Sequence, residues 1–163
     1  MQTLIHDDFL LTTEPARRLY HEHAEKMPIF DYHCHLNPQE IYENKQFSSI
    51  GEAWLAGDHY KWRVMRASGV PERFVTGETD FREKYDHFAA IMPGLVGNPI
   101  YHWSHLELKR FFGVDELLNA QTANTIWDKA NACLQSPEGA ARALITSSNV
   151  RALCTTDDPA DDL

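Results

Sequence analysis

A short buried strand is predicted at Ile29-Phe30-Asp31-Tyr32-His33-Cys34-His35, an apolar run that is rich in strand-forming residues and ends in two histidines. Side chains at positions i and i+2 of a strand share a face, so the imidazoles of His33 and His35 can converge on one metal ion while Cys34 points into the opposite layer. The pair stands at the carboxyl end of the strand, where α/β sheets build their sites. The open alternative is one packed histidine and one solvated histidine.

Helix signals surround this strand. An amphipathic helix is predicted after Thr13, and further helices follow the strand up to about residue 146. A second short strand is predicted at residues 149–156, after which the sequence ends in an acidic segment. The residues expected to cap or open these helices are Thr13, Asn37, Ser49, Thr79, Asn98 and Ser136.

Two strands that are joined through helices pair most naturally in parallel, and parallel sheets are stable only when they are larger and covered on both faces. We therefore expect an α/β protein of which this chain is the front part, with most of its residues in helices. The predicted segments are 1–36 (helix and first strand), 37–146 (helical insertion) and 147–163 (second strand).

The composition limits the classes of partner. Lys and Arg number 15 against 24 Asp and Glu, and the net charge of -9 disfavours nucleic acid. Neither a signal peptide nor an apolar run of about 18 residues is visible, so we expect a soluble, cytoplasmic protein without a membrane partner. The three cysteines contain no Cys-x-x-Cys pair, which argues against a disulfide framework and a thiolate zinc site.

Three polar stretches are further site candidates. His59 and Tyr60 lie side by side in Asp58-His59-Tyr60-Lys61-Trp62-Arg63 and can act as a general acid/base pair or polarise a carbonyl. The alternative is an Asp58 N-cap followed by an amphipathic helix with packed Tyr60 and Trp62. His102 and His105 share a helical face, but without a well-placed carboxylate a structural or interface role is favoured. Cys154-Thr155-Thr156-Asp157-Asp158-Pro159 either lines a site or caps a helix.

Five motifs in order along the chain resemble uronate (glucuronate) isomerase of the amidohydrolase superfamily. The match is specific because the motifs span nearly the whole sequence, whereas the His-x-His pair alone indicates only the superfamily. The motifs are Asp8-Phe9-Leu10-Leu11, Phe30-Asp31-Tyr32-His33-Cys34-His35-Leu36, Gly57-Asp58-His59-Tyr60-Lys61-Trp62-Arg63, Asn98-Pro99-Ile100-Tyr101-His102-Trp103-Ser104-His105-Leu106-Glu107-Leu108 and Cys154-Thr155-Thr156-Asp157-Asp158-Pro159.

The resemblance implies the amino-terminal part of a distorted TIM (β/α)8 barrel, whose first strand-to-helix connection is expanded into the helical insertion. It implies an aldose–ketose isomerase that interconverts D-glucuronate with D-fructuronate and D-galacturonate with D-tagaturonate. His33 and His35 would hold a divalent metal, with zinc favoured, and His59, Tyr60 and Arg63 would contact the hexuronate.

In the family that this chain resembles, the third metal ligand and a carboxylate-binding arginine lie in sequence that this chain does not contain. We therefore expect this chain to be inactive alone. Two other hypotheses stay open at this stage: a metal-dependent amidohydrolase-type hydrolase, and a helical interaction module in which the His-x-His pair is incidental. The sequence leaves the oligomeric state open, a homo-oligomer included.

Overall fold

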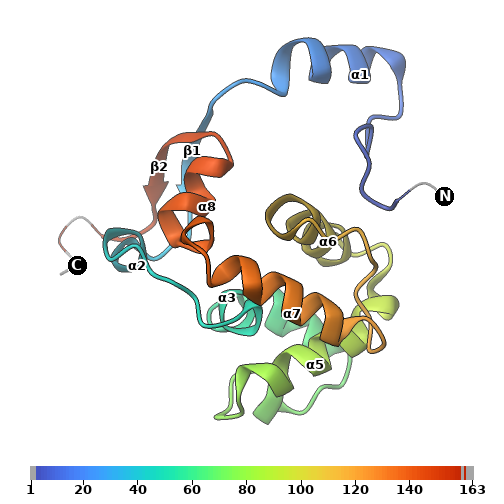
Figure 1. Cartoon of the computed structure of the whole chain (residues 1–163), viewed down its shortest axis with the longest axis vertical. Coiled ribbons are helices and arrows are strands. Elements are labelled where there is room, and N and C mark those ends of the chain that lie inside the picture. Colours follow the sequence, from blue (N-terminus) through green and yellow to red (C-terminus); the bar gives the residue numbers. More distant parts are fainter. Residues whose placement is uncertain (1–2, 159, 161–163) are drawn as a thin grey trace. The chain divides into compact units, whose positions relative to one another are not determined.

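The computed structural model describes residues 3–158 and 160 of the chain (Figure 1). These residues form two compact units, each containing separate pieces of sequence. The helical unit comprises Met1–Ile5 and Phe47–Gln135, and the strand unit comprises His6–Gln46 and Ser136–Leu163. The division falls inside the predicted insertion of residues 37–146, because the helix at the carboxyl end of that segment packs against the second strand and the helix at its amino end packs against that helix.

The strand unit contains a two-stranded parallel sheet. Strand β1 (Ile29–Cys34) pairs with β2 (Val150–Thr155), and the register places Ile29 opposite Val150 and Cys34 opposite Thr155. Helix α8 (Ala141–Ser147) packs against β2, and α2 (Pro38–Tyr42) packs against α8 (Figure 1). A 3-10 turn, η4 (Pro137–Gly139), precedes α8. The predicted parallel pairing of the two strands is confirmed.

The expectation that β1 is buried is wrong for the described residues. Ile29, Phe30 and Tyr32 are 47%, 67% and 88% exposed. A parallel strand is buried when further strands and helices cover it on both sides. Here β1 has β2 as its single strand neighbour among the described residues, so these three side chains stay in solvent.

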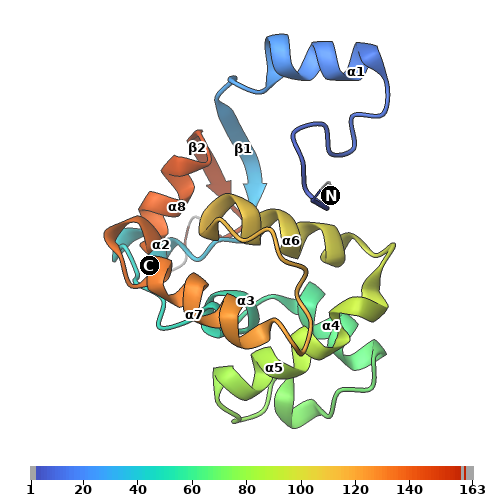
Figure 2. The ribbon, with the colours of Figure 1, turned by 45° about the vertical axis from the view of Figure 1, so that its right-hand side comes forward.

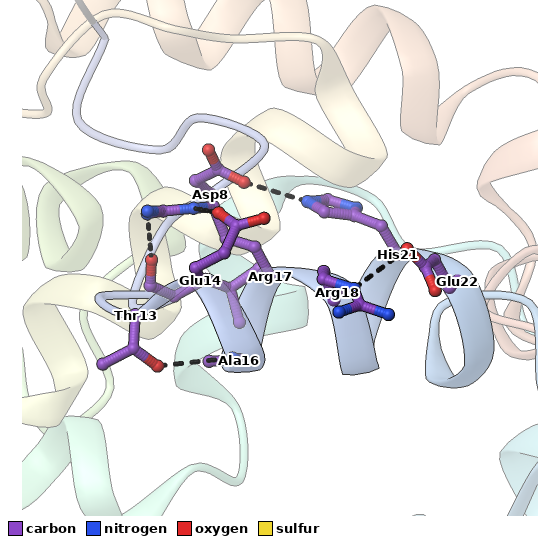
Figure 3. A network of polar contacts seen from close by, with 9 residues as sticks. Asp8, Thr13, Glu14, Ala16, Arg17, Arg18, His21 and Glu22 are labelled. Carbon is purple, nitrogen blue, oxygen red and sulfur yellow. Dashed lines mark hydrogen bonds and ion pairs between the residues drawn. The ribbon is translucent and has the colours of Figure 1, made fainter.

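Helix α1 (Glu14–Leu19) begins where the sequence predicts. The hydroxyl of Thr13 accepts a hydrogen bond from the backbone N–H of Ala16. The chain then continues as a π-helical segment, η1 (Tyr20–Ala24), which ends before Pro28. Figure 3 shows the polar contacts that tie this helix to the loop before it, including an ion pair between His21 and Asp8.

The helical unit holds most of the helices (Figure 2). Helix α3 packs against α4, α5 and α7, while α6 packs against α7. The elements in chain order are α3 (Ile50–Leu55), α4 (His59–Ala67), η2 (Glu72–Phe74), α5 (Phe81–Ile91), η3 (Met92–Leu95), α6 (Pro99–Phe112) and α7 (Ala123–Leu134). Among the described residues between 37 and 146, the only β pairing is an isolated bridge from Gln46 to Ala140, so the predicted helical character is confirmed.

Most of the predicted helix starts are confirmed. Asn37, Ser49 and Asn98 accept hydrogen bonds from backbone N–H groups of the helices that follow them, and Gly113 ends α6 in the left-handed conformation with φ +61°. A left-handed residue after the last turn is the usual place for glycine, because it has no Cβ to clash.

Two predicted caps are corrected. Asp80, and not Thr79, caps α5: its carboxylate accepts from the N–H of Glu83, while the Thr79 hydroxyl donates to the carbonyl of Arg73. Ser136 makes no side-chain cap, and a 3-10 turn follows it before α8 begins. Thr79 and Asp80 are adjacent cap-forming residues, so only the path of the preceding loop decides between them.

Candidate functional site

His33 and His35 lie side by side, as the alternation of side chains along a strand predicts. Their Nε2 atoms are 3.3 Å apart, and the ring centroids are 5.0 Å apart with the planes nearly perpendicular. Both side chains are exposed, whereas Cys34 between them is half-buried. His33 is in β1 and His35 follows its last residue, so the pair stands at the carboxyl end of the strand.

The separation of the two nitrogens suits a shared metal ion. Two imidazoles that each bind zinc at about 2.0–2.1 Å in a tetrahedral site hold their nitrogens about 3.3 Å apart. Within residues 3–158 and 160, no group of three or more His, Cys, Asp or Glu side chains is arranged to hold a metal. The described part of the chain therefore offers two converging ligands for such an ion.

The second nitrogen of His35 has a partner from the other strand. His35 Nδ1 lies 3.2 Å from the hydroxyl of Thr156, which follows β2. When Nδ1 carries the proton and donates it to this oxygen, Nε2 presents its lone pair toward His33. Metal-binding histidines usually have such a partner on their other nitrogen, which orients the ring.

The carboxylate of Asp31 is engaged locally. Its Oδ1 accepts a hydrogen bond from the backbone N–H of His33 at 3.2 Å. The pairing of β1 with β2 is irregular between Asp31 and Cys34, and Asp31 is half-buried like Cys34, whereas the two histidines are exposed. The hydrogen bond from His33 to Asp31 helps to hold the strand end that presents the pair.

In the helical unit, the run 58–63 forms the first turns of α4. The carboxylate of Asp58 accepts hydrogen bonds from the backbone N–H groups of Tyr60 and Lys61 at 2.9 and 3.0 Å. Asp58 is thus the N-cap of this helix, as the alternative reading expects. That reading also packs Tyr60 and Trp62. It is wrong for Tyr60, which is 49% exposed, whereas Trp62 is half-buried and its Nε1 donates to the carbonyl of Leu55 at 2.8 Å.

His59, Tyr60 and Arg63 form an exposed cluster on α4. The rings of His59 and Tyr60 have centroids 4.6 Å apart and planes inclined by 32°. The guanidinium carbon of Arg63 lies 5.9 Å from the centre of the Tyr60 ring. The cluster therefore offers an imidazole, a phenol and a fixed positive charge within one helical turn.

A buried lysine binds the N-cap of the helix that carries this cluster. Lys61 is 5% exposed, and its Nζ donates to Asp58 Oδ2 at 2.8 Å and lies 3.7 Å from Glu107 Oε2. Burial raises the pKa of Asp58, but the charge and hydrogen bonds of Lys61 outweigh burial and leave that pKa below its usual value. Burial also raises the pKa of Glu107, which Lys61 only partly counteracts. Lys61 and Glu107 lie within two of the matched motifs, but neither was predicted as a site residue.

His105 has a structural role. It is 3% exposed; its Nδ1 donates to the carbonyl of Tyr101 at 2.7 Å, and its Nε2 accepts from the N–H of Leu118 at 3.0 Å. Burial lowers the pKa of His105, which favours the neutral imidazole whose Nε2 accepts from Leu118. With both nitrogens occupied by backbone groups, this histidine joins α6 to the loop before α7, as favoured from the sequence.

The candidate residues thus form two groups, each within one unit. His33, His35 and Thr156 belong to the strand unit, and the cluster on α4 belongs to the helical unit. Thr156 was part of a polar stretch with no assigned role, and only the strand pairing shows which histidine it contacts. Pro159, in the same stretch, lies outside the described residues.

No helix in the described part of the chain is long and apolar enough to cross a membrane.

Comparison with known proteins identifies relatives over the whole sequence. Uronate isomerase of Marinomonas sp. (strain MWYL1) is 56% identical over 164 residues, which cover 100% of this chain and 35% of that protein. Uronate isomerase of Bacillus velezensis is also 56% identical over 163 residues, again 35% of its length. The chain therefore spans about a third of the curated relatives that it matches.

Solved structures show the same fold. Uronate isomerase from Thermotoga maritima superposes with a TM-score of 0.90 at 40% identity, covering 97% of this chain and 34% of that one. Glucuronate isomerase from Caulobacter crescentus gives 0.88 at 29% identity, covering 99% and 36%. The family model for glucuronate isomerase matches residues 1–163. This chain therefore belongs to the glucuronate isomerase family.

Proposed function

We propose that the protein of which this chain forms a part is a uronate isomerase that interconverts D-glucuronate with D-fructuronate and D-galacturonate with D-tagaturonate in hexuronate catabolism. The observation that carries the proposal is the family match over residues 1–163, which include the converging His33–His35 pair. The match is to an isomerase family, so it favours this activity over the hydrolase and interaction-module hypotheses.

The rest of the proposal follows the same family. The strands β1 and β2 would be the first two of a distorted (β/α)8 barrel of the amidohydrolase superfamily, and the enzyme would act in the cytoplasm. A parallel pair with an adjoining helix on β2 is compatible with the opening of such a barrel.

His33 and His35 would hold a divalent metal, with zinc favoured because two nitrogens 3.3 Å apart suit tetrahedral ligation. Such an ion, when bound, supplies a Lewis acid that polarises an oxygen of the substrate. Thr156 would orient His35 through the Nδ1 contact.

His59, Tyr60 and Arg63 would contact the open-chain sugar. Exchange of an aldose with a ketose moves a proton between C1 and C2 through an enediol, or moves a hydride, and either route needs a polarised carbonyl and a proton-transfer group. The imidazole of His59 and the phenol of Tyr60 can exchange protons with the substrate, and both are exposed at the start of α4. Arg63 would bind the polar substrate with its permanent charge.

The test is an isomerase assay on the full-length protein with each uronate, together with metal analysis. Replacing His33 by Ala should abolish stoichiometric metal, and His59→Ala or Tyr60→Phe should reduce kcat by about 10²-fold. His23→Ala, at an exposed histidine in η1, is the matched control and should leave both unchanged. The 163-residue chain alone should not turn over either uronate.

Normal turnover of both uronates by the His59 and Tyr60 variants would remove the assigned roles. Failure of the unmodified full-length protein to isomerise either uronate would overturn the proposed function itself.

A further inference from the structure

The start of α4 is attached to the rest of the helical unit by contacts of the Lys61 and Trp62 side chains. Successive residues of an α-helix are about 100° apart, so Lys61 lies about 200° around the helix from His59. Lys61 is buried while His59 and Arg63 are exposed. Lys61, which holds this turn, therefore lies on the side of the helix opposite His59 and Arg63.

Lys61 joins two carboxylates from different elements. Its Nζ donates to Asp58 Oδ2 at 2.8 Å at the N-cap of α4 and lies 3.7 Å from Glu107 Oε2 on α6. The same Nζ lies 5.3 Å from the ring centre of Trp54 on α3, a distance at which an ammonium group is attracted to the ring. One buried ammonium group thus links three helices.

Asp58 connects the Lys61 side chain to the exposed residues, because Asp58 is also the N-cap of their helix. Asp58 uses Oδ1 to bind the backbone N–H groups of Tyr60 and Lys61, and Oδ2 to bind the Lys61 side chain. A shift of this carboxylate must move the backbone of the residues that carry the two rings. A second attachment holds the adjacent side of α4, because Trp62 Nε1 donates to the carbonyl of Leu55 at 2.8 Å.

We propose that Lys61 is a positioning residue: by holding Asp58 against Glu107, it fixes the direction in which α4 presents the His59 and Tyr60 rings. The positioning itself rests on the geometry of this chain, whereas its consequence for catalysis rests on the proposed function. Misplacing a reacting group by about 1 Å can reduce a rate by about 10²-fold, so a residue that never touches substrate can control turnover.

The chain offers a matched control. Lys84 on α5 is also buried, at 7% exposed, and its Nζ lies 5.3 Å from the ring centre of Phe81. Lys61→Met and Lys84→Met each remove one buried charge from the same unit. A general structural effect should therefore appear in both variants, and a positioning effect only in the first.

Asp58→Asn is the second variant, in case Lys61→Met does not fold. Asparagine caps a helix as well as aspartate does, so this change keeps the cap and removes the charge that binds Lys61. We expect both variants, and not Lys84→Met, to shift the NMR signals of the His59 and Tyr60 rings in the 163-residue chain. These signals report the packing of rings whose centroids are 4.6 Å apart.

In the full-length enzyme, we expect Lys61→Met and Asp58→Asn to lower kcat by about tenfold or more with a smaller change in KM, and Lys84→Met to leave kcat within about twofold. Lys61→Arg, which keeps the positive charge, should restore part of the loss. Ring signals and kcat in Lys61→Met and Asp58→Asn that match those of Lys84→Met would overturn the inference. If the full-length protein shows no isomerase activity while the ring signals still respond, the proposed function fails and the positioning role stands.

Discussion

The two units differ in where their apolar side chains lie. Within the described residues, the helical unit contains every buried hydrophobic side chain except Ala140 and Ala141. The strand unit instead holds most of the large hydrophobic side chains that are exposed, including Leu10, Phe30 and Tyr32 at 70%, 67% and 88%. The helical unit thus packs its own core, whereas the strand unit presents apolar surface that other residues would have to cover.

The candidate site residues of the two units also differ in what holds them in place. In the helical unit, the exposed cluster on α4 is supported by a close-packed interior that includes Tyr85 and Phe88. In the strand unit, the histidine pair depends on a two-stranded sheet and on contacts such as His35 with Thr156. A two-stranded sheet is marginal by itself. We therefore expect substitutions in the two units of this chain to have very different effects.

The largest expected contrast comes from the same substitution in each unit. Phe88 is fully buried and Phe30 is 67% exposed. Phe88→Ala should lower the free energy of unfolding of the 163-residue chain by about 3–5 kcal/mol, because it removes apolar burial and leaves a cavity. Phe30→Ala should change it by less than about 0.5 kcal/mol. Urea denaturation of the two variants measures the difference.

Similar losses in both variants would contradict the contrast between the units. Repeating Phe30→Ala in the full-length protein sharpens the contrast. A loss in the free energy of unfolding that appears only in the full-length protein means that residues outside this chain cover Phe30.

The next effect is a pH dependence in the helical unit. Burial lowers the pKa of His105, so the unfolded state takes up a proton below about pH 6.5, whereas the folded state takes it up only at lower pH. Stability should therefore fall as the pH drops below about 6.5, by at most about 1.4 kcal/mol per pH unit. His105→Gln should be less stable at neutral pH and should lack this slope. Denaturation between pH 7.5 and 5 checks the prediction, and a slope that persists in the variant would assign it to another group.

The smallest expected effect is the pH dependence of the His21 contact in the strand unit, which weakens as the pH rises and so is opposite in sign to that of His105. Hydrogen bonds that His21 donates to the carboxylates of Asp8 and then Glu25 raise the pKa of His21 (Figure 3 shows the contact with Asp8). The charged imidazole therefore holds the loop before α1 most firmly below about pH 6.5, and the contact weakens as the pH rises through the raised pKa. An NMR titration should place the His21 pKa above 6.5, and Asp8→Asn should lower it.

Glu14→Gln is the control for this titration, because Glu14 pairs with Arg17 and not with His21. An unchanged His21 titration in Asp8→Asn would mean that the raised pKa does not come from the contact drawn in Figure 3.

Local features of the fold were predictable from the sequence because their partners lie within a few residues. The caps at Asn37, Asp58 and Asn98 bind N–H groups two or three positions ahead, and Gly113 ends α6 through its own backbone conformation. The convergence of His33 and His35 follows from the two-residue period of a strand. The order of the five motifs likewise pointed to the family that the comparisons show.

Other features depended on contacts between distant parts of the chain. Lys61 meets Glu107 from another helix, and His35 meets Thr156 across 121 positions. No local pattern marks such a partner, because packing alone brings it close. Exposure was decided in the same way: β1 has the composition of a buried strand, but side chains are buried only where other elements cover them. The sequence by itself thus determined most of the helix starts, the strand pairing and the two converging histidines, and the tertiary structure decided which charged groups support the exposed cluster.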